Sequence, residues 1–231
     1  MTTNGYPTFL TYRPSELRFG TSGLRGLVRE MTDLEVYINT RGFLDYLHQI
    51  GDVGSGDPIA LAQDLRDVDP SSGLSSSPRI ALAVSQAIRD AELSVVNCGK
   101  VPTPTLAYYA QLEDAATGKQ PMPSIMVTGS HIPADRNGIK FYKQAGEVLK
   151  SDEAGILAAV KAVRAREYAK DESGSIFDVD GMLKTSPEAA LVQCAAEAAY
   201  LQRYLSLFPD EKPLAGKRVV VKQGEIALEI G

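Results

Sequence analysis

The stretch IMVTGSHIPADRNGIKFYK, residues 125–143, places a polar loop between two short apolar runs. The run over 124–128 has the length and apolar content of a buried strand. A second strand is predicted over 139–143, after an Asn137-Gly138 turn, because Asn-Gly is a strong hairpin signal. The second strand should fold back beside the first as an antiparallel edge, with Ser130 in the loop that leaves the first strand.

Short apolar runs alternate with helical patterns along the rest of the chain, which is typical of an α/β layer structure. Further strands are predicted over 58–64 and 93–99. Helices are predicted to follow the segment VPTPT, residues 101–105, and the three capping residues Thr32 (in a Thr-x-x-Glu capping box), Ser77 and Ser151. We therefore expect an α/β fold with three α/β/α layers and a mixed, mostly parallel sheet.

A change of composition suggests how the chain is divided. Residues 169–185 are polar and rich in Gly and Ser, which is typical of a linker. A helix is predicted to start at Ser186-Pro187 and end before Pro209, and a strand is predicted over 217–221. We expect a domain over 1–168, a linker over 169–185 and, over 186–231, the incomplete start of a second domain with a divergent tail.

The overall composition excludes several classes of protein. The 231 residues are 44% hydrophobic, enough to bury a core, and the net charge of −5 with no run of Lys or Arg argues against a nucleic-acid partner. The N-terminus lacks the pattern of a signal peptide, and no apolar stretch approaches the roughly 18 residues of a membrane span. Cys98 and Cys194 are far apart in the sequence and predict no disulfide framework. We expect a cytoplasmic protein without a membrane partner.

Ser130 follows a predicted strand end, where sites collect in open α/β sheets. An acyl-transfer nucleophile would need a separate base, and the adjacent His131 is poorly placed to take the serine proton. The G-x-S-x-G elbow of hydrolases is absent. A phosphate carrier is a second possibility, since Lys140 could offset the phosphate charge. The third is phosphate binding without a covalent step, and an ordinary loop is the alternative to all three.

A second stretch, RFGTSGLRGLV over 18–28, is rich in glycine. Small residues with free N–H groups, together with one arginine, form a natural cradle for an anion. The spacing is not that of a nucleotide-binding P-loop, and a glycine-rich turn that packs closely against the fold is the plainer interpretation. The residues of interest are Gly20, Thr21, Ser22, Gly23, Arg25 and Gly26.

Together these stretches closely resemble the α-D-phosphohexomutase superfamily, the phosphoglucomutases, phosphomannomutases and their relatives. The resemblance rests on FGTSGLRG, VPTPT and TGSHIPADRNGIKFY, and it covers about residues 17–165 in order. The segment QDLR, residues 63–66, is similar to the family's G-R-D-x-R loop. Asp64 and Arg66 match that loop, whereas Ala62 and Gln63 depart from it.

The resemblance implies a mechanism through a bisphosphate. Ser130 would be the phosphoserine that carries the phosphoryl group while hexose 1-phosphate and hexose 6-phosphate are interconverted. The intermediate would be a hexose 1,6-bisphosphate, which also serves as activator. Arg25 and Lys140 would lie near the transferring phosphoryl group and assist proton movement. His131 would contact the phosphoserine or the sugar, or would only position the loop. The expected phosphate-binding residues are Thr21, Ser22, Gly23 and Asn137.

The resemblance also implies a Mg²⁺ ion, with Ser130 as a ligand through its phosphate. The family's remaining ligands come from a D-G-D-x-D-R loop in a second domain, and that motif is absent from this sequence. The family's sugar-reading Gly-Glu-x-Ser loop is absent as well. We therefore expect a truncated phosphohexomutase, inactive without the missing domains II to IV. A non-catalytic phosphosugar-binding module is the alternative, and the hexose is not identified.

Overall fold

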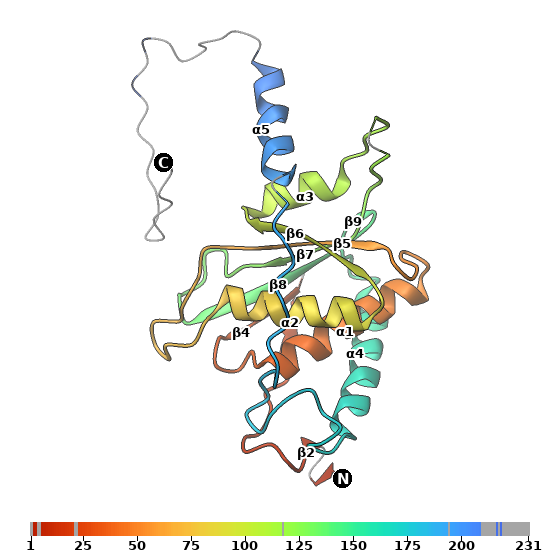
Figure 1. Ribbon diagram of the computed structural model, residues 1–231, viewed down its shortest axis with the longest axis vertical. Coiled ribbons are helices and arrows are strands. Elements are labelled where there is room, and N and C mark those ends of the chain that lie inside the picture. The colour runs from red at the N-terminus through yellow and green to blue at the C-terminus, as the bar shows by residue number, and fades with distance from the viewer. Residues whose placement is uncertain are drawn as a thin grey trace.

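The computed structural model describes residues 2–3, 6–20, 23–116, 118–193, 195–208, 216 and 218. Figure 1 shows a twisted sheet between two helical layers. One layer contains α1 (Asp33–Gln49), α2 (Ser77–Asp90) and α4 (Glu153–Tyr168), and the other contains α3 (Thr103–Gln111) and α5 (Ala195–Leu207). The expected three-layer α/β/α fold with a mixed sheet is confirmed. None of the helices in the described ranges is long and apolar enough to cross a membrane.

The main sheet is less parallel than we expected. Its strand order is β3 (Arg18–Phe19), β4 (Gly23–Leu27), β8 (Arg136–Lys143), β7 (Ser124–Val127), β5 (Pro58–Gln63) and β6 (Ser94–Lys100), with β9 (Gly146–Glu147) beside β8. Only β5–β6 and β5–β7 pair in parallel, and the other pairs are antiparallel. A separate small sheet joins β1 (Thr2–Thr3) and β2 (Tyr6–Pro7).

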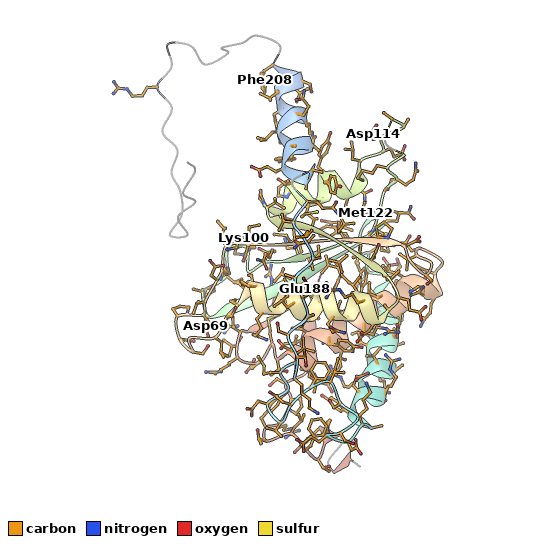
Figure 2. All side chains as sticks on the ribbon, in the orientation of Figure 1. Asp69, Lys100, Asp114, Met122, Glu188 and Phe208 are labelled. Carbon is orange, nitrogen blue, oxygen red and sulfur yellow. The ribbon has the colours of Figure 1, made fainter. Side chains whose placement is uncertain are left out.

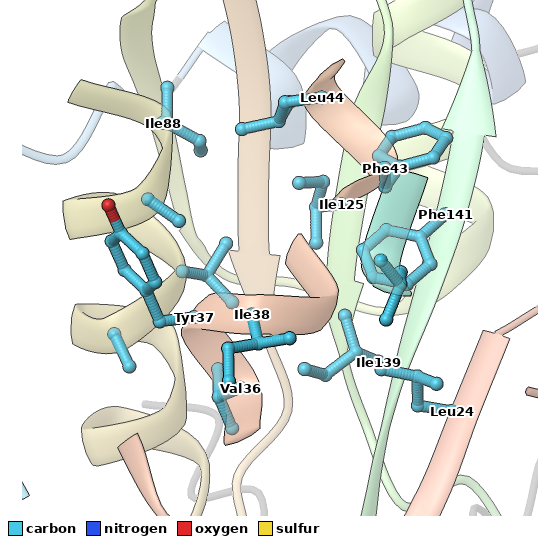
Figure 3. Close-up of a cluster of buried hydrophobic side chains, with 14 of the residues drawn as sticks. Leu24, Val36, Tyr37, Ile38, Phe43, Leu44, Ile88, Ile125, Ile139 and Phe141 are labelled. Carbon is cyan, nitrogen blue, oxygen red and sulfur yellow. The ribbon is translucent and has the colours of Figure 1, made fainter. Parts of the chain in front are cut away.

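The larger core lies between the sheet and the layer of α1, α2 and α4 (Figure 3). Successive strand residues point to opposite faces, so Ile139 and Phe141 of β8 enter this core. The ring of Phe141 stacks on Phe43 of α1 with centroids 4.6 Å apart. At Gly42, an added Cβ would lie 2.6 Å from Cα of Val160, so the close crossing of α1 and α4 requires glycine there.

The predicted Asn137-Gly138 turn is wrong, because both residues lie inside β8. Asn137 pairs with Gly26 and Gly138 with Arg25 in the ladder between β4 and β8. This non-local pairing extends the strand toward its start and moves the chain reversal to residues 129–135. The predicted antiparallel pairing of β7 and β8 is confirmed, but β8 is an interior strand rather than an edge.

The segment predicted as a linker packs against the fold. The side chain of Phe177 is fully buried and meets the ring of Tyr37 edge to face at 5.4 Å. The N–H of Leu34 donates to the carbonyl of Gly181 at 2.9 Å, at the start of α1. Residues 175–183 thus cover the N-terminal end of α1. The division of the chain into domains stays a prediction.

The helix predicted from Ser186 begins only at Ala195, although it ends before Pro209 as expected. The preceding segment runs along β6 instead, where Gln193 N–H donates to the carbonyl of Asn97 at 2.7 Å. The Asn97 side chain in turn donates to the carbonyl of Ala190. These contacts hold the segment extended and delay the helix. The strand predicted over 217–221, Arg218 apart, lies outside the described residues, as does Cys194.

Candidate functional site

An open cleft of about 930 Å³ lies at the carboxyl ends of the parallel strands β5, β6 and β7. The loops that leave these strands form its walls, as expected for an open α/β sheet. Ser130, His131 and Lys140 all line it, so the structure brings these three predicted site residues together. The other lining residues are Gln63, Asp64, Leu65, Arg66, residues 100–104, Met126, Thr128, Ile132, Pro133 and Ala134.

Ser130 is held in an unusual backbone conformation. Its φ of 54° lies in the left-handed region, which costs a residue with a Cβ on the order of 1–3 kcal/mol. The N–H of Ser130 donates to Oγ1 of Thr128 at 2.9 Å. The residue is exposed at the cleft, and its Oγ lies 3.3 Å from Nδ1 of His131. The hydroxyl is therefore presented to solvent beside an imidazole nitrogen.

Arg66 fixes the loop that carries Ser130. Its guanidinium donates to four backbone carbonyls of the loop: Ser130 at 3.3 Å, Ile132 at 2.7 Å, Pro133 at 2.8 Å and Arg136 at 3.2 Å. The arginine is 9% exposed, so these bonds are shielded from water. An added Cβ at Gly129 would lie 2.4 Å from Cζ of Arg66, so glycine is required where the loop crosses the guanidinium.

Asp64 completes this support from the end of β5. One carboxylate oxygen accepts the N–H of Gly129 at 2.9 Å, and the other accepts the hydroxyl of Ser77 at 2.5 Å. The sequence identifies Asp64 and Arg66 as a motif match but predicts no role for either residue. The available signal was their D-x-R spacing directly after a predicted strand.

Lys140 and Arg25 lie on the same face of the sheet. Arg25 pairs with Gly138, which is two residues from Lys140 in β8, and residues two apart share a face. An added Cβ at Gly138 would come within 3.3 Å of Cγ of Arg25, so the arginine side chain crosses over this glycine. Lys140 lines the cleft and Arg25 is exposed next to that wall.

The structure does not bring Asn137 into the cleft. It faces the opposite side of the sheet, is fully buried, and donates to the hydroxyls of Ser76 and Ser77 at 2.8 and 2.9 Å. Its amide therefore ties β8 to the start of α2. Gly23 is a buried residue of β4, where an added Cβ would lie 1.9 Å from the carbonyl oxygen of Ile139. Thr21 and Ser22 lie outside the described residues.

The described side chains do not fit a magnesium site. Mg²⁺ prefers carboxylate and other oxygen ligands in near-octahedral geometry. In the parts of the chain that the structure describes, no group of three or more His, Cys, Asp or Glu is placed to hold a metal ion. Asp64, the carboxylate in the cleft wall, already accepts hydrogen bonds from Gly129 and Ser77.

The fold and the site together define an α/β/α domain whose cleft, at the strand ends, carries a serine loop and a lysine, with an arginine on the same face of the sheet. Residues 16–167 match the family model described as phosphoglucomutase/phosphomannomutase, alpha/beta/alpha domain I. The chain belongs to the phosphoglucomutase/phosphomannomutase family.

Two curated relatives show the extent of this similarity. A phosphomannomutase of Sinorhizobium fredii is 36% identical over 83% of this chain and 35% of its own length. A phosphoglucosamine mutase of Rippkaea orientalis is 30% identical over 95% of this chain and 40% of its own length. The chain thus spans less than half the length of these relatives.

One solved structure extends the comparison to the fold. A phosphoglucomutase/phosphomannomutase family protein of Burkholderia thailandensis superposes with a TM-score of 0.53 and 26% identity. The match covers 66% of this chain and 31% of that protein. The similarity therefore extends from the sequence to the fold, over about two thirds of the chain.

Proposed function

We propose that this chain is the phosphoserine-bearing domain of a phosphohexomutase, which interconverts hexose 1-phosphate and hexose 6-phosphate. The observation that carries the proposal is the placement of Ser130. Its hydroxyl is exposed at the cleft, in a strained conformation that Asp64 and Arg66 maintain through Gly129 and the loop carbonyls. Backbone strain of this kind collects at functional sites, where the surrounding structure over-determines it.

In the proposed reaction, a sugar hydroxyl attacks the phosphorus of phosphorylated Ser130. A new bond forms between the sugar oxygen and phosphorus, and the bond between Oγ and phosphorus breaks. The hydroxyl proton leaves the sugar oxygen, and Oγ gains a proton. The product is a hexose 1,6-bisphosphate, and after it reorients in the site the reverse step returns its other phosphoryl group to Ser130.

Positioning and charge stabilisation supply most of the catalysis in phosphoryl transfer. Lys140 lines the cleft that holds Ser130, and within the described part of the chain its ammonium has no hydrogen-bond or ion-pair partner. Its ammonium is therefore available to the phosphoryl oxygens. Arg25, on the same face, adds a second positive charge, and His131 contacts the serine oxygen. Mg²⁺ would need protein ligands beyond the described residues, so we assign it no step.

The alternative is a phosphosugar-binding module without catalysis. It is favoured by the lack of a carboxylate cluster in the described residues. The two functions differ in whether a covalent phosphoserine forms.

Mass spectrometry distinguishes them. The purified chain should gain one phosphate, on Ser130, when it is incubated with glucose 1,6-bisphosphate and Mg²⁺. Ser130→Ala should gain none, and the matched variant Ser151→Ala, at an exposed serine away from the cleft, should behave as the original chain. Phosphate on another serine, unaffected by Ser130→Ala, would contradict the proposal.

A further inference from the structure

Lys100 is a cleft cation to which neither the motifs nor the comparisons assign a role. It is the last residue of β6 and pairs with Gln63, the last residue of β5, so it lies at the strand edge where the cleft opens. It lines the cleft together with Ser130 and Lys140. Figure 2 shows Lys100 on the same side of the molecule as the loop that contains Asp69.

The ammonium of Lys100 forms an ion pair with Asp67 at 2.8 Å. Both side chains are well exposed, at 42% for Lys100 and 59% for Asp67. An exposed pair of this kind contributes only about 0–1 kcal/mol to stability, because water screens it and both side chains lose freedom. The pair can therefore open at little cost when a competing anion enters the cleft.

The two partners differ in how firmly they are held. Asp67 directly follows Arg66, whose guanidinium is bound to the Ser130 loop. The backbone carbonyl of Asp67 accepts the N–H of Ser76 at 3.0 Å. Asp67 is thus anchored on a fixed backbone. Lys100 carries its charge on a flexible four-carbon stem. When the pair opens, the lysine is the partner that can turn into the cleft.

We propose that Lys100 is a second anion-binding residue of the cleft, which leaves Asp67 to bind a phosphate group of a sugar phosphate. Lys100 on β6 and Lys140 on β8 are separated by three strand spacings, about 14 Å between backbones at the usual 4.8 Å. Both side chains line the space between them. A sugar bisphosphate can therefore meet one lysine with each phosphate, whereas a single phosphate meets one at a time.

This proposal rests on the proposed function for the identity of its ligand, but not on the covalent step. Binding of glucose 1,6-bisphosphate and of inorganic phosphate is measured by calorimetry on the full chain carrying Ser130→Ala, which cannot be phosphorylated there. In this background Lys100→Gln should weaken bisphosphate binding about three- to tenfold, as expected for loss of one charge-assisted contact. Its effect on inorganic phosphate should be smaller.

Asp67→Asn is the decisive companion variant. It releases Lys100, so bisphosphate binding should tighten by about twofold or more, opposite in direction to Lys100→Gln. Lys150→Gln is the matched control, since Lys150 is 91% exposed and pairs with Glu153 away from the cleft. It should bind as the parent does. Thermal unfolding of all three variants should stay close to the parent, because only exposed ion pairs are lost.

Unchanged bisphosphate affinity in Lys100→Gln would overturn the proposal, as would an equal loss in Lys100→Gln and Asp67→Asn, which would make the pair structural. Absence of measurable binding in the parent would overturn it too. Phosphorylation of Ser130, followed separately by mass spectrometry on chains with the serine intact, tests the proposed function. A Lys100-dependent affinity without phosphoserine would retain this inference and reject the covalent role.

Discussion

The carboxylate of Asp64 accepts the backbone N–H of Gly129 at 2.9 Å and so fixes the residue that precedes Ser130. The bond joins the end of β5 to the end of β7, which are neighbouring parallel strands. It places the serine loop against the strand edge on one side, while the Arg66 guanidinium holds its carbonyls on the other. The conformation of Ser130 is thus set by side chains that never touch its hydroxyl.

Replacing Arg66 should loosen this loop. Arg66→Gln removes the guanidinium that makes four hydrogen bonds to backbone carbonyls at a buried position, and breaking such a buried charged network costs about 3 kcal/mol or more. Urea unfolding should show that loss, and amide hydrogen exchange should rise at residues 130–133. Arg136→Gln, at an exposed side chain, is the control and should change neither. Unchanged exchange in Arg66→Gln would show that the loop holds itself.

Gly129 should not tolerate a side chain. Gly129→Ala would bring a Cβ to 2.4 Å from Cζ of Arg66, and overpacking in a confined site costs about 1–3 kcal/mol. Gly54→Ala offers a matched comparison, because its nearest neighbour would be 3.8 Å away. Denaturant midpoints measure both. Equal midpoints for the two variants would mean that Arg66 can move aside without cost.

Asn137 should act on stability rather than on phosphate binding. Asn137→Ala leaves the hydroxyls of Ser76 and Ser77 without their donor in a buried place, which costs about 1–3 kcal/mol. Phosphate affinity measured by calorimetry should stay unchanged at a temperature where the variant is folded. Lys140→Gln is the comparison and should weaken that affinity. A weaker affinity in Asn137→Ala without loss of stability would restore Asn137 to the binding site.

These features separate what local pattern can predict from what it cannot. The alternation of short apolar strands with helices depends only on residues close together in the sequence, and so does the serine loop at the end of a strand. Both features could therefore be predicted. The Asn137-Gly138 turn was mispredicted because β4, more than a hundred residues earlier in the chain, pairs with these residues and keeps them extended. The late start of α5 has the same kind of cause, since Asn97 binds the preceding segment.

The candidate site shows the same limit. Ser130 and His131 are adjacent in the sequence, and Lys140 follows within the same short stretch. This local spacing was enough to group the three residues. The role of Arg66 depends on carbonyl partners 64 to 70 residues away, which no local pattern reveals. Glu35 was predicted to close a capping box, yet its carboxylate binds Arg164 at 2.6 Å across the α1–α4 interface.

The thiol of Cys98 should be unreactive in the folded chain. Burial raises its pKa to about 12 from a usual value of 9.0, although the nearby Lys119 acts in the opposite direction. Since the thiolate is the reactive form, iodoacetamide should label the Cys98 peptide slowly at pH 8, as read by mass spectrometry, and rapidly in urea. A fast reaction without denaturant would contradict this burial.

The same shift has a consequence for stability. Because the folded state holds the thiol proton of Cys98 more tightly than the unfolded chain does, the protonated thiol contributes to the stability of the folded state. This contribution to stability is fully present below pH 9 and is lost as the pH rises toward about 12, because the unfolded chain releases the thiol proton first. Cys98→Ala should remove the part of the alkaline loss of stability that comes from this thiol. A denaturation series between pH 8 and pH 11, comparing this variant with the parent, measures it.

This chain on its own should not turn over as a mutase. The described residues supply a candidate phosphoryl carrier and cations, but no carboxylate cluster for Mg²⁺. The D-G-D-x-D-R and Gly-Glu-x-Ser motifs that the family resemblance leads us to expect are absent from the sequence. Because phosphoryl transfer depends on positioning and charge, each missing contact should cost on the order of 10²-fold in rate. Several such losses together should leave the rate near the uncatalysed background.

A coupled assay of glucose 1-phosphate to glucose 6-phosphate at high protein concentration tests this, with Ser130→Ala as the control. The parent chain and Ser130→Ala should give the same rate, even where mass spectrometry finds phosphate on Ser130 of the parent. That combination would separate a single slow phosphoryl transfer to Ser130 from repeated catalytic turnover. Robust turnover that disappears in Ser130→Ala would instead show that the residues of this chain suffice, and that its cleft reads the sugar without further domains.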